Sequence, residues 1–306
     1  MKTLLEHVHG LEIGEVQRHK NMSIAPLFGA ESALDYLVFD KALRNGLSIS
    51  ETGNVPTLHF ANKTGKEVMI LQGEYILGGK QNRMVAANVY MERGFDGDVP
   101  VRCVQQNRWQ GDIGSGFDTS ESIAPKAVMY AASVGQDEVW SEVRCLARAH
   151  RVATPTQNLG DIIQEKKRDT NDFVHSFSYI PGSIGIVASI VSHGITRYSA
   201  DVFDRRETMG HHFNKLVESL ALDALGGSYA REKNYDDFIT FIRSIESCQF
   251  NERKPVSLGR DFQLQGQGIE GFALTYEEVP LYVTFSTSLS SHEPLNQIRT
   301  GYRRYR

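Results

Sequence analysis

Two short polar segments stand out because their amide and guanidinium groups could bind an anion. Residues 77–83 have the sequence LGGKQNR, and residues 105–109 have the sequence QQNRW. Arginine binds carboxylates and phosphates through two parallel hydrogen bonds, and the Gln and Asn amides can bond to hydroxyl groups. The tryptophan that follows the second segment offers a surface for stacking beside a charge. The repeated tripeptide QNR proves nothing by itself, since a chain of 306 residues repeats some tripeptides by chance.

The pattern after the first segment predicts which of its side chains face the core. Apolar residues occupy alternate positions from Val85 to Met91, and alternate residues of a strand share one face. Extending this pattern backwards places Gln81 and Arg83 on the apolar face. Lys80 and Asn82 then point the other way. An arginine at the end of a core face needs a partner, because an unpaired buried charge is expensive.

Glu74 is the nearest acidic residue before the bend, which leaves two hypotheses for Arg83. In the first, Glu74 and Arg83 form an ion pair that ties a hairpin together. In the second, Arg83 binds an anion or a ribose while Gln81 and Asn82 contact hydroxyl groups. Spacing alone does not separate them, because structural ion pairs resemble functional sites. The glycine pair before Lys80 permits the tight backbone turn that both hypotheses require.

The two QNR segments meet in space if their strands are antiparallel neighbours. The first segment precedes an expected strand at residues 84–91, and the second follows an expected strand at residues 99–104. The start of one strand lies beside the end of its antiparallel neighbour. The sequence therefore predicts a single polar rim that carries both segments.

Composition indicates a globular protein with a sizeable core. Hydrophobic residues make up 41% of the chain and charged residues 23%, which is ordinary for a globular protein. The net charge is −4, and the last eight residues hold four arginines and no acid, so the rest of the chain is more acidic still. This acidic balance argues against a nucleic-acid partner, because nucleic-acid binders present a basic surface. We expect the basic tail to be a solvated end.

Cysteine usage and the absence of long apolar runs favour a cytoplasmic protein that is not in a membrane. The three cysteines lack the spacing of a disulfide framework. Acidic residues occur too early within the first fifteen residues to leave room for the apolar core of a signal peptide. Cys103 lies at alternate spacing from Val99 and Val101 and so shares their strand face, which predicts a buried core thiol. No metal site is predicted, since the histidines lack partner ligands at fixed spacing.

The order of expected elements predicts an α+β fold. We expect a strand-rich, β-sandwich-like domain at residues 1–110, a linker at 111–122 rich in Gly, Ser and Asp, and a mixed helix and antiparallel-sheet domain at 123–306 that ends in the basic tail. In the second half, residues 139–147, 209–224 and 236–247 have helical periodicity. Residues 133–136 and 204–207 have the spacing of capping boxes, in which two side chains satisfy free backbone N–H groups at a helix start.

The motifs of the first half resemble those of the ARG-and-rhodanese-phosphatase-superfamily-associated protein domain family. Members typically carry Gly-Glu, then Lys-Gln-Asn-Arg, then a Cys-Val-Glu-Gln-x-Arg-Trp block. This chain has LQGEYILGGKQNR and, at residues 99–109, VPVRCVQQNRW. Gln105 replaces the acid that is common in the family, which removes one candidate general base. The likeness spans roughly residues 15–285.

The resemblance implies one shared site and says little about a reaction. The family is associated with ADP-ribosylglycohydrolases and phosphatase-like proteins, and no reaction is established for it. The residues that the resemblance places in one site are Glu74, Gln81, Arg83, Gln106, Arg108 and Trp109.

Two hypotheses for function follow from the motifs and the resemblance. In the first, the chain binds or processes an anionic, nucleotide-derived small molecule such as ADP-ribose, with Glu74 as the general base if there is a reaction. The ligand-binding residues would be Lys80, Gln81, Asn82, Arg83, Gln106, Arg108 and Trp109. In the second, the chain is a non-enzymatic regulatory protein that docks to a glycohydrolase or phosphatase partner, and the motif is an ion-pair clasp. The sequence does not decide between an enzyme and a binding protein, and it indicates no cofactor.

Overall fold

The structure is a computed structural model that describes residues 2–108, 116–192, 194–227 and 235–288. Trp109, the first part of the predicted linker and the arginine-rich tail lie outside the described residues.

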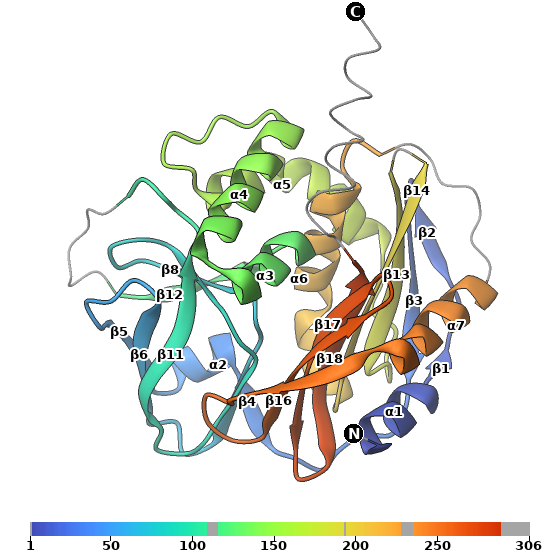
Figure 1. Cartoon of the computed structure of the whole chain (residues 1–306), viewed down its shortest axis with the longest axis horizontal. Coiled ribbons are helices and arrows are strands. Elements are labelled where there is room, and N and C mark those ends of the chain that lie inside the picture. The colour runs from blue at the N-terminus through green and yellow to red at the C-terminus, as the bar shows by residue number, and fades with distance from the viewer. Residues whose placement is uncertain (1, 109–115, 193, 228–234, 289–306) are drawn as a thin grey trace, which may run out of the picture.

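Two sheets form the front half of the chain (Figure 1). One has the strand order β12-β8-β9-β11-β6-β5 and the other has the order β10-β7-β4. All neighbours are antiparallel except β4 and β7, which run parallel. The strands are β4 (Tyr36–Val38), β5 (Leu47–Glu51), β6 (Thr57–Asn62), β7 (Glu67–Ile70), β8 (Glu74–Leu77), β9 (Arg83–Val85), β10 (Val89–Met91), β11 (Asp96–Cys103) and β12 (Asp118–Ile123).

A shared apolar core holds these two sheets together. Ile70 and Val89 come from the smaller sheet, and Phe60 and Val85 come from the larger one, all within one buried cluster. Phe39, at the start of α2 (Phe39–Arg44), packs into the same cluster. Strands with apolar residues on one face are buried in this way when two sheets pack face to face.

A nine-stranded antiparallel sheet dominates the back half. Its order is β1-β3-β13-β14-β18-β17-β16-β15, with β2 paired to β3. The strands are β1 (Glu12–Ile13), β2 (Gln17–His19), β3 (Met22–Phe28), β13 (Gly185–Ser192), β14 (Ile195–Phe203), β15 (Gln249–Arg253), β16 (Arg260–Gly266), β17 (Ile269–Tyr276) and β18 (Val279–Thr287). Strand β3, near the start of the chain, therefore pairs with β13, which follows more than 150 residues later.

Helices cover both faces of the nine-stranded sheet, and α6 lies between this sheet and the front half (Figure 1). The helices are α1 (Lys2–His9), α3 (Lys126–Val134), α4 (Gln136–His150), α5 (Leu159–Ser176), α6 (Arg206–Ala224) and α7 (Tyr235–Arg243), with a short 3₁₀ helix η1 (Ser244–Ser247). Alternate residues of β3 face opposite helices: Ile24 packs with α6, whereas Ala25 packs with α1 and α7. This alternation follows from the two-residue period of a strand.

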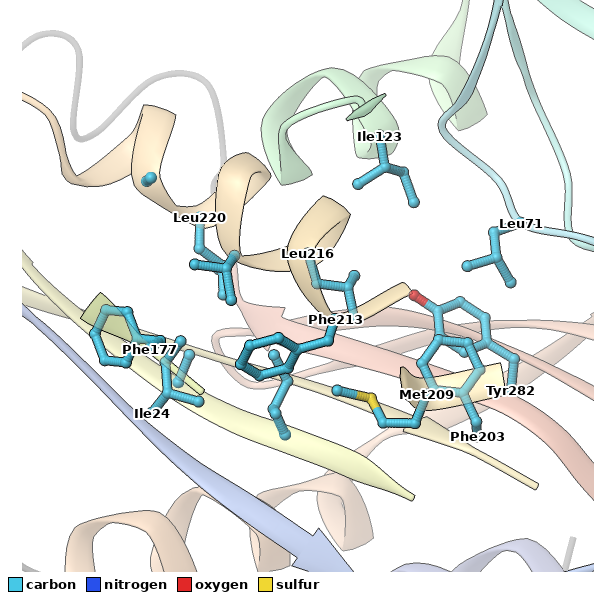
Figure 2. Close-up of a cluster of buried hydrophobic side chains, with 14 of the residues drawn as sticks. Ile24, Leu71, Ile123, Phe177, Phe203, Met209, Phe213, Leu216, Leu220 and Tyr282 are labelled. Carbon is cyan, nitrogen blue, oxygen red and sulfur yellow. The ribbon is translucent and has the colours of Figure 1, made fainter. Parts of the chain in front are cut away.

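Figure 2 shows how α6 joins the two halves of the molecule. Phe213 and Leu220 lie against the nine-stranded sheet, in the same cluster as Ile24. Leu71 and Ile123, which belong to the front half, complete the cluster. A helix surrounded by apolar neighbours on several sides is buried almost all round, and most residues of α6 are buried.

The predicted α+β class is confirmed, and the sheets do not follow the predicted boundary at residue 110. Residues 12–28 belong to the sheet formed mainly by residues 185–287. Residues 118–122 of the predicted linker belong to β12, which pairs with β8. The division into two domains stays a prediction. Among the described residues, no helix combines the length and apolar character needed to span a bilayer.

Both predicted capping boxes are wrong, because their side chains have partners in other elements. Helix α4 follows Gly135 without a side-chain cap, and the amide of Gln136 instead bonds the backbone N–H and C=O of Cys103 at 2.9 and 2.8 Å. Helix α6 begins after Arg205, also without a side-chain cap. Asp204 instead accepts hydrogen bonds from hydroxyl groups of the front half.

Gly79 is expected to tolerate alanine far worse than Gly53, although both have positive φ angles of +56° and +81°. A Cβ at Gly79 would lie 2.5 Å from Glu51 Oε1 and 2.6 Å from the Phe117 ring, whereas a Cβ at Gly53 meets nothing within 4 Å. Both substitutions add backbone strain, but only Gly79→Ala adds overpacking, which costs about 1–3 kcal/mol. Denaturant unfolding of the two variants measures the difference, and equal destabilisation would show that residues 77–83 are not tightly packed.

Candidate functional site

The two QNR segments meet at one end of the β9–β11 pair. These strands are antiparallel, and Arg83 lies directly opposite Cys103. Beyond the paired residues, Arg108 Nη2 donates to Asn82 Oδ1 at 3.1 Å. The expectation that antiparallel pairing brings the segments together is confirmed by these contacts.

Gln105 holds the rim in place, a role that sequence reasoning missed. Its backbone carbonyl accepts from Gln81 Nε2 at 3.2 Å, and its side-chain oxygen accepts from the backbone N–H of Asn82 at 3.3 Å. Its amide nitrogen donates to Thr156 Oγ1 at 3.1 Å. Asn82 also donates to Asn158 Oδ1 at 3.4 Å, so the residue that caps α5 lies at the same rim. The glutamine in place of the family's acid thus bridges three segments of the chain.

Arg83 is completely buried, and one edge of its guanidinium makes no hydrogen bond to the described residues. As predicted, Arg83 and Gln81 face the core, at 0% and 4% exposure, while Asn82 is half-buried. Arg83 Nη1 donates to both the backbone and side-chain oxygens of Gln81, each at 3.1 Å. Within the described part of the chain, Nε and Nη2 have no hydrogen-bond partner. These two nitrogens form one edge of the planar guanidinium, the fork that binds carboxylates and phosphates with two parallel hydrogen bonds.

Glu51 is the acid beside Arg83, and it lies beyond hydrogen-bonding distance. Glu51 Oε2 is 3.8 Å from Arg83 Nη2, longer than the 2.7–3.2 Å of protein hydrogen bonds. Its other oxygen accepts from the backbone N–H of Lys80 at 2.9 Å. Burial lowers the pKa of Arg83, and the nearby charge of Arg108 lowers it further. Glu51 therefore offsets part of the positive charge of the site without hydrogen-bonding to the Nε and Nη2 edge of Arg83.

Arg108 Nε is a further buried donor that has no hydrogen-bond partner among the described residues. The Tyr75 hydroxyl also donates to no acceptor among the described residues, and the side chain of Trp140 lies beside Cys103. Each of these side chains interacts with Cys103, as Arg83 does across the strand pair. Burial raises the pKa of Tyr75 well above its usual range, so its hydroxyl stays a donor. A cluster of donors such as this accepts a ligand group that carries only acceptors.

Glu74 does not pair with Arg83, so the predicted ion-pair clasp is wrong. Glu74 Oε1 lies 3.3 Å from Lys215 Nζ and 3.5 Å from His212 Nε2, both on α6. Its other oxygen accepts from the backbone N–H of Leu71 at 2.9 Å. Burial alone would raise the pKa of Glu74, but Lys215 and His212 outweigh it and lower the pKa to about 2. A carboxylate so weakly basic, held away from Arg83, is poorly placed to act as the general base of this site.

The remaining predicted residues are only partly brought together. Lys80 contributes its backbone N–H to Glu51, as described above. Gln106 turns toward α4, where its side-chain oxygen accepts from Arg144 Nη1 at 3.0 Å. Trp109 lies outside the described residues. The site on the described residues thus consists of Gln81, Asn82, Arg83 and Arg108, with Tyr75, Cys103, Gln105 and Trp140 as neighbours that the sequence did not indicate.

A cavity of about 280 Å³ lies elsewhere, between β4, α2 and the start of α6. It is lined by charged side chains that mostly pair with one another: Lys66 Nζ is 2.6 Å from Asp35 Oδ2, and Lys41 Nζ is 3.1 Å from Glu207 Oε1. None of the predicted site residues lines it. Arg205, the third cation of the lining, donates to the backbone carbonyls of Leu34 and Tyr36 at 2.7 and 3.3 Å.

Glu74→Gln should destabilise the protein by about 3 kcal/mol at neutral pH, because it leaves Lys215 buried without a charge partner. The pKa of Glu74 is lowered on folding, so its contribution is fully present above the unfolded pKa, near 4.5, and is lost as the pH falls toward 2. The difference in unfolding free energy between wild type and variant should therefore narrow from pH 7 to pH 3. A cost that is equal at both pH values would contradict the ion pair.

Lys215→Met in the Glu74→Gln background is the matched control. Removing the second charge should recover part of the lost stability, since the double variant no longer buries an unpaired ammonium group. Unfolding in denaturant of the four proteins of this cycle measures the coupling.

Comparison with protein families matches residues 10–286 to the ARG and Rhodanese-Phosphatase-superfamily-associated Protein domain, ARPP-1. The match covers most of the 306 residues and includes both QNR segments. Comparisons with curated proteins and with solved structures find no match. The chain therefore belongs to the ARG and Rhodanese-Phosphatase-superfamily-associated Protein domain family.

Proposed function

We propose that the chain binds a small anionic molecule, with the Nε and Nη2 edge of Arg83 as the primary contact. The observation that carries the proposal is a guanidinium at 0% exposure whose bidentate edge has no hydrogen-bond partner among the described residues. Buried donors are normally bonded, and a buried donor without an acceptor costs about 1–3 kcal/mol. An anion in the fork removes this cost and gains two charge-assisted hydrogen bonds.

Charge in the site supports an anion over a neutral ligand. Arg83 and Arg108 bring two positive charges, and Glu51 is the one carboxylate that the described residues place within 4 Å of either guanidinium. Arg83 Nε, Arg83 Nη2 and Arg108 Nε, which have no hydrogen-bond partner among the described residues, are all donors. A ligand group that carried donors at this point would leave some of them unmatched, whereas a phosphate or carboxylate group offers acceptors alone.

The exposure of the rim suggests how a ligand would lie. Arg83 is fully buried, while Arg108 and Asn82 are half-buried and bonded to each other. The anionic end of a ligand would reach inward to Arg83, and its remaining atoms would pass Arg108 toward solvent. Gln81 would then orient the arginine rather than contact hydroxyl groups, since its side-chain oxygen already accepts from Arg83.

The finer form of the proposal is a nucleotide-derived ligand such as ADP-ribose. A diphosphate could engage both guanidiniums, and each charge-assisted hydrogen bond would contribute about 1.5–3 kcal/mol. The name of the family, which records an association with ARG and rhodanese-phosphatase proteins, is in keeping with this class of ligand. Docking to a glycohydrolase partner stays a prediction, and no contact of the described residues favours it over ligand binding.

Titration with ADP-ribose, ADP, ribose 5-phosphate and inorganic phosphate tests the proposal, with adenosine as the uncharged control. At about 100 times its dissociation constant, a bound ligand should add about 2.7 kcal/mol to the free energy of unfolding. We expect at least one of the anionic compounds to raise the melting temperature of the wild type, and adenosine to leave it unchanged.

The Arg83→Lys variant tests whether binding needs the bidentate guanidinium edge or only the positive charge. Lysine keeps the positive charge but cannot make two parallel hydrogen bonds, so affinity should fall at least about tenfold, or 1.4 kcal/mol. Arg93→Gln removes an exposed arginine paired with Glu67 and should leave binding unchanged. Arg108→Gln, at a half-buried position, serves if the Arg83 variant does not fold. Anion binding by a folded Arg83→Lys protein with wild-type affinity would refute the proposal.

A further inference from the structure

The cavity between β4, α2 and the start of α6 offers a second place for a small ligand, apart from the anion site at Arg83. Its volume is about 280 Å³, and none of the residues of the anion site lines it. Pockets for drug-sized ligands have volumes of about 300–1,000 Å³, so this cavity suits a smaller molecule. Its buried lining residues are Tyr36, Val38 and Thr208.

The charged residues of the lining have both signs. Lys41, Lys66 and Arg205 bring three positive charges, whereas Asp35 and Glu207 bring two negative charges. The lysine that pairs with each acid is the main cause that lowers the pKa of that acid, and Arg205 lowers both pKa values further. These charges therefore face the same space, with one positive charge in excess.

The ion pairs of the lining are exposed, so a ligand can replace one partner of each. Lys66 Nζ lies 2.6 Å from Asp35 Oδ2, and Lys41 Nζ lies 3.1 Å from Glu207 Oε1. The side chains of Asp35 and Glu207 are 70% and 68% exposed. Exposed ion pairs contribute little to stability, because water screens them and two long side chains must be ordered. A carboxylate or an ammonium group of a ligand can therefore take over these charges at little cost.

Arg205 is held at the cavity wall, and one of its donors lacks an acceptor. Its guanidinium lies over the Tyr36 ring, 3.8 Å from the ring centre. Nη1 and Nη2 donate to the carbonyls of Leu34 and Tyr36. Nε is buried and has no hydrogen-bond partner among the described residues. Buried donors are normally bonded, so an oxygen of a ligand would complete the hydrogen bonds of Arg205.

We propose that this cavity binds a small amino-acid-like zwitterion with one carboxylate in excess, such as an acidic amino acid. Its carboxylates pair with Arg205 and the lysines, and its ammonium group pairs with Asp35 and Glu207. Its single net negative charge offsets the excess positive charge of the lining. His211 leaves this balance unchanged, because its Nε2 lies 2.7 Å from the carboxylate of Asp40, outside the lining.

Ligands of a single sign fit the lining less well. An anion without an ammonium group would lie against Asp35 and Glu207, and a cation would lie against Arg205 and the two lysines. Like charges brought together in a binding site cost affinity. The lining therefore favours a ligand that carries both signs, and it does so independently of the proposed function at Arg83.

Titration of the full chain with L-glutamate tests the inference, with glutarate and L-glutamine as matched probes at equal ionic strength. Glutarate lacks the ammonium group, and L-glutamine lacks the second carboxylate. We expect L-glutamate to raise the melting temperature and to bind at least about tenfold more tightly than either probe, since each probe loses charge-assisted hydrogen bonds. Glutarate that binds as tightly as L-glutamate would overturn the inference, and so would the lack of any shift with L-glutamate and L-aspartate.

Variants of exposed residues locate the ligand without disturbing the core. Lys66→Gln should weaken the binding of L-glutamate, and Glu207→Gln should remove its advantage over glutarate. Lys63→Gln changes an exposed lysine outside the lining and should leave binding unchanged. L-glutamate binding that neither Lys66→Gln nor Glu207→Gln alters would place the ligand elsewhere and overturn the inference. Arg83→Lys should leave L-glutamate binding intact, so this inference and the proposed function fail separately.

Discussion

The ion pair between Glu74 and helix α6 determines the charge of the candidate site. Glu74 could have neutralised Arg83 across the hairpin, but its carboxylate contacts Lys215 and His212 instead. Arg83 is left with Glu51, whose nearer oxygen is 3.8 Å away. The result is a buried cation whose Nε and Nη2 donors have no hydrogen-bond partner among the described residues. The anion site follows from the pairing of Glu74 with α6 instead of Arg83.

Glu74 has this partner because α6 is buried between the two halves of the molecule (Figure 1). A polar side chain on such a helix needs a partner from a neighbouring element, since water cannot reach it. Besides Lys215, the helix uses Glu218, which accepts from Ser122 Oγ at 2.6 Å, and Ser219, which donates to the carbonyl of Ala124 at 3.1 Å. These bonds tie residues of the front half to α6, whose apolar side chains pack against the nine-stranded sheet (Figure 2).

Local sequence patterns correctly predicted the structural features that depend on residues close together in the chain. The two-residue period placed Gln81 and Arg83 on the buried face, and antiparallel pairing brought Asn82 to Arg108. The α+β class followed from the same periodicities. In each case the deciding constraint acts within one strand or between strands that are close in the chain.

Contacts between distant segments explain what the sequence did not reveal. Lys215 lies 141 residues from Glu74, and no local pattern connects them. Gln136 has the spacing of a capping residue but bonds the backbone of Cys103. The alternation of residues in the strand correctly predicted that Cys103 is buried. Its position opposite Arg83 depends on the register of β9 and β11, which the sequence does not give.

A crystal of the protein soaked in tungstate tests the central claim most directly, since this heavy oxyanion is visible by anomalous scattering. The account predicts an anomalous peak at Arg83, with oxygens about 2.7–2.9 Å from both Nε and Nη2, and loss of this peak in crystals of Arg83→Lys. Tungstate bound at surface sites alone, with the Glu51 carboxylate hydrogen-bonded in the fork, would contradict the account and make Arg83 a structural residue.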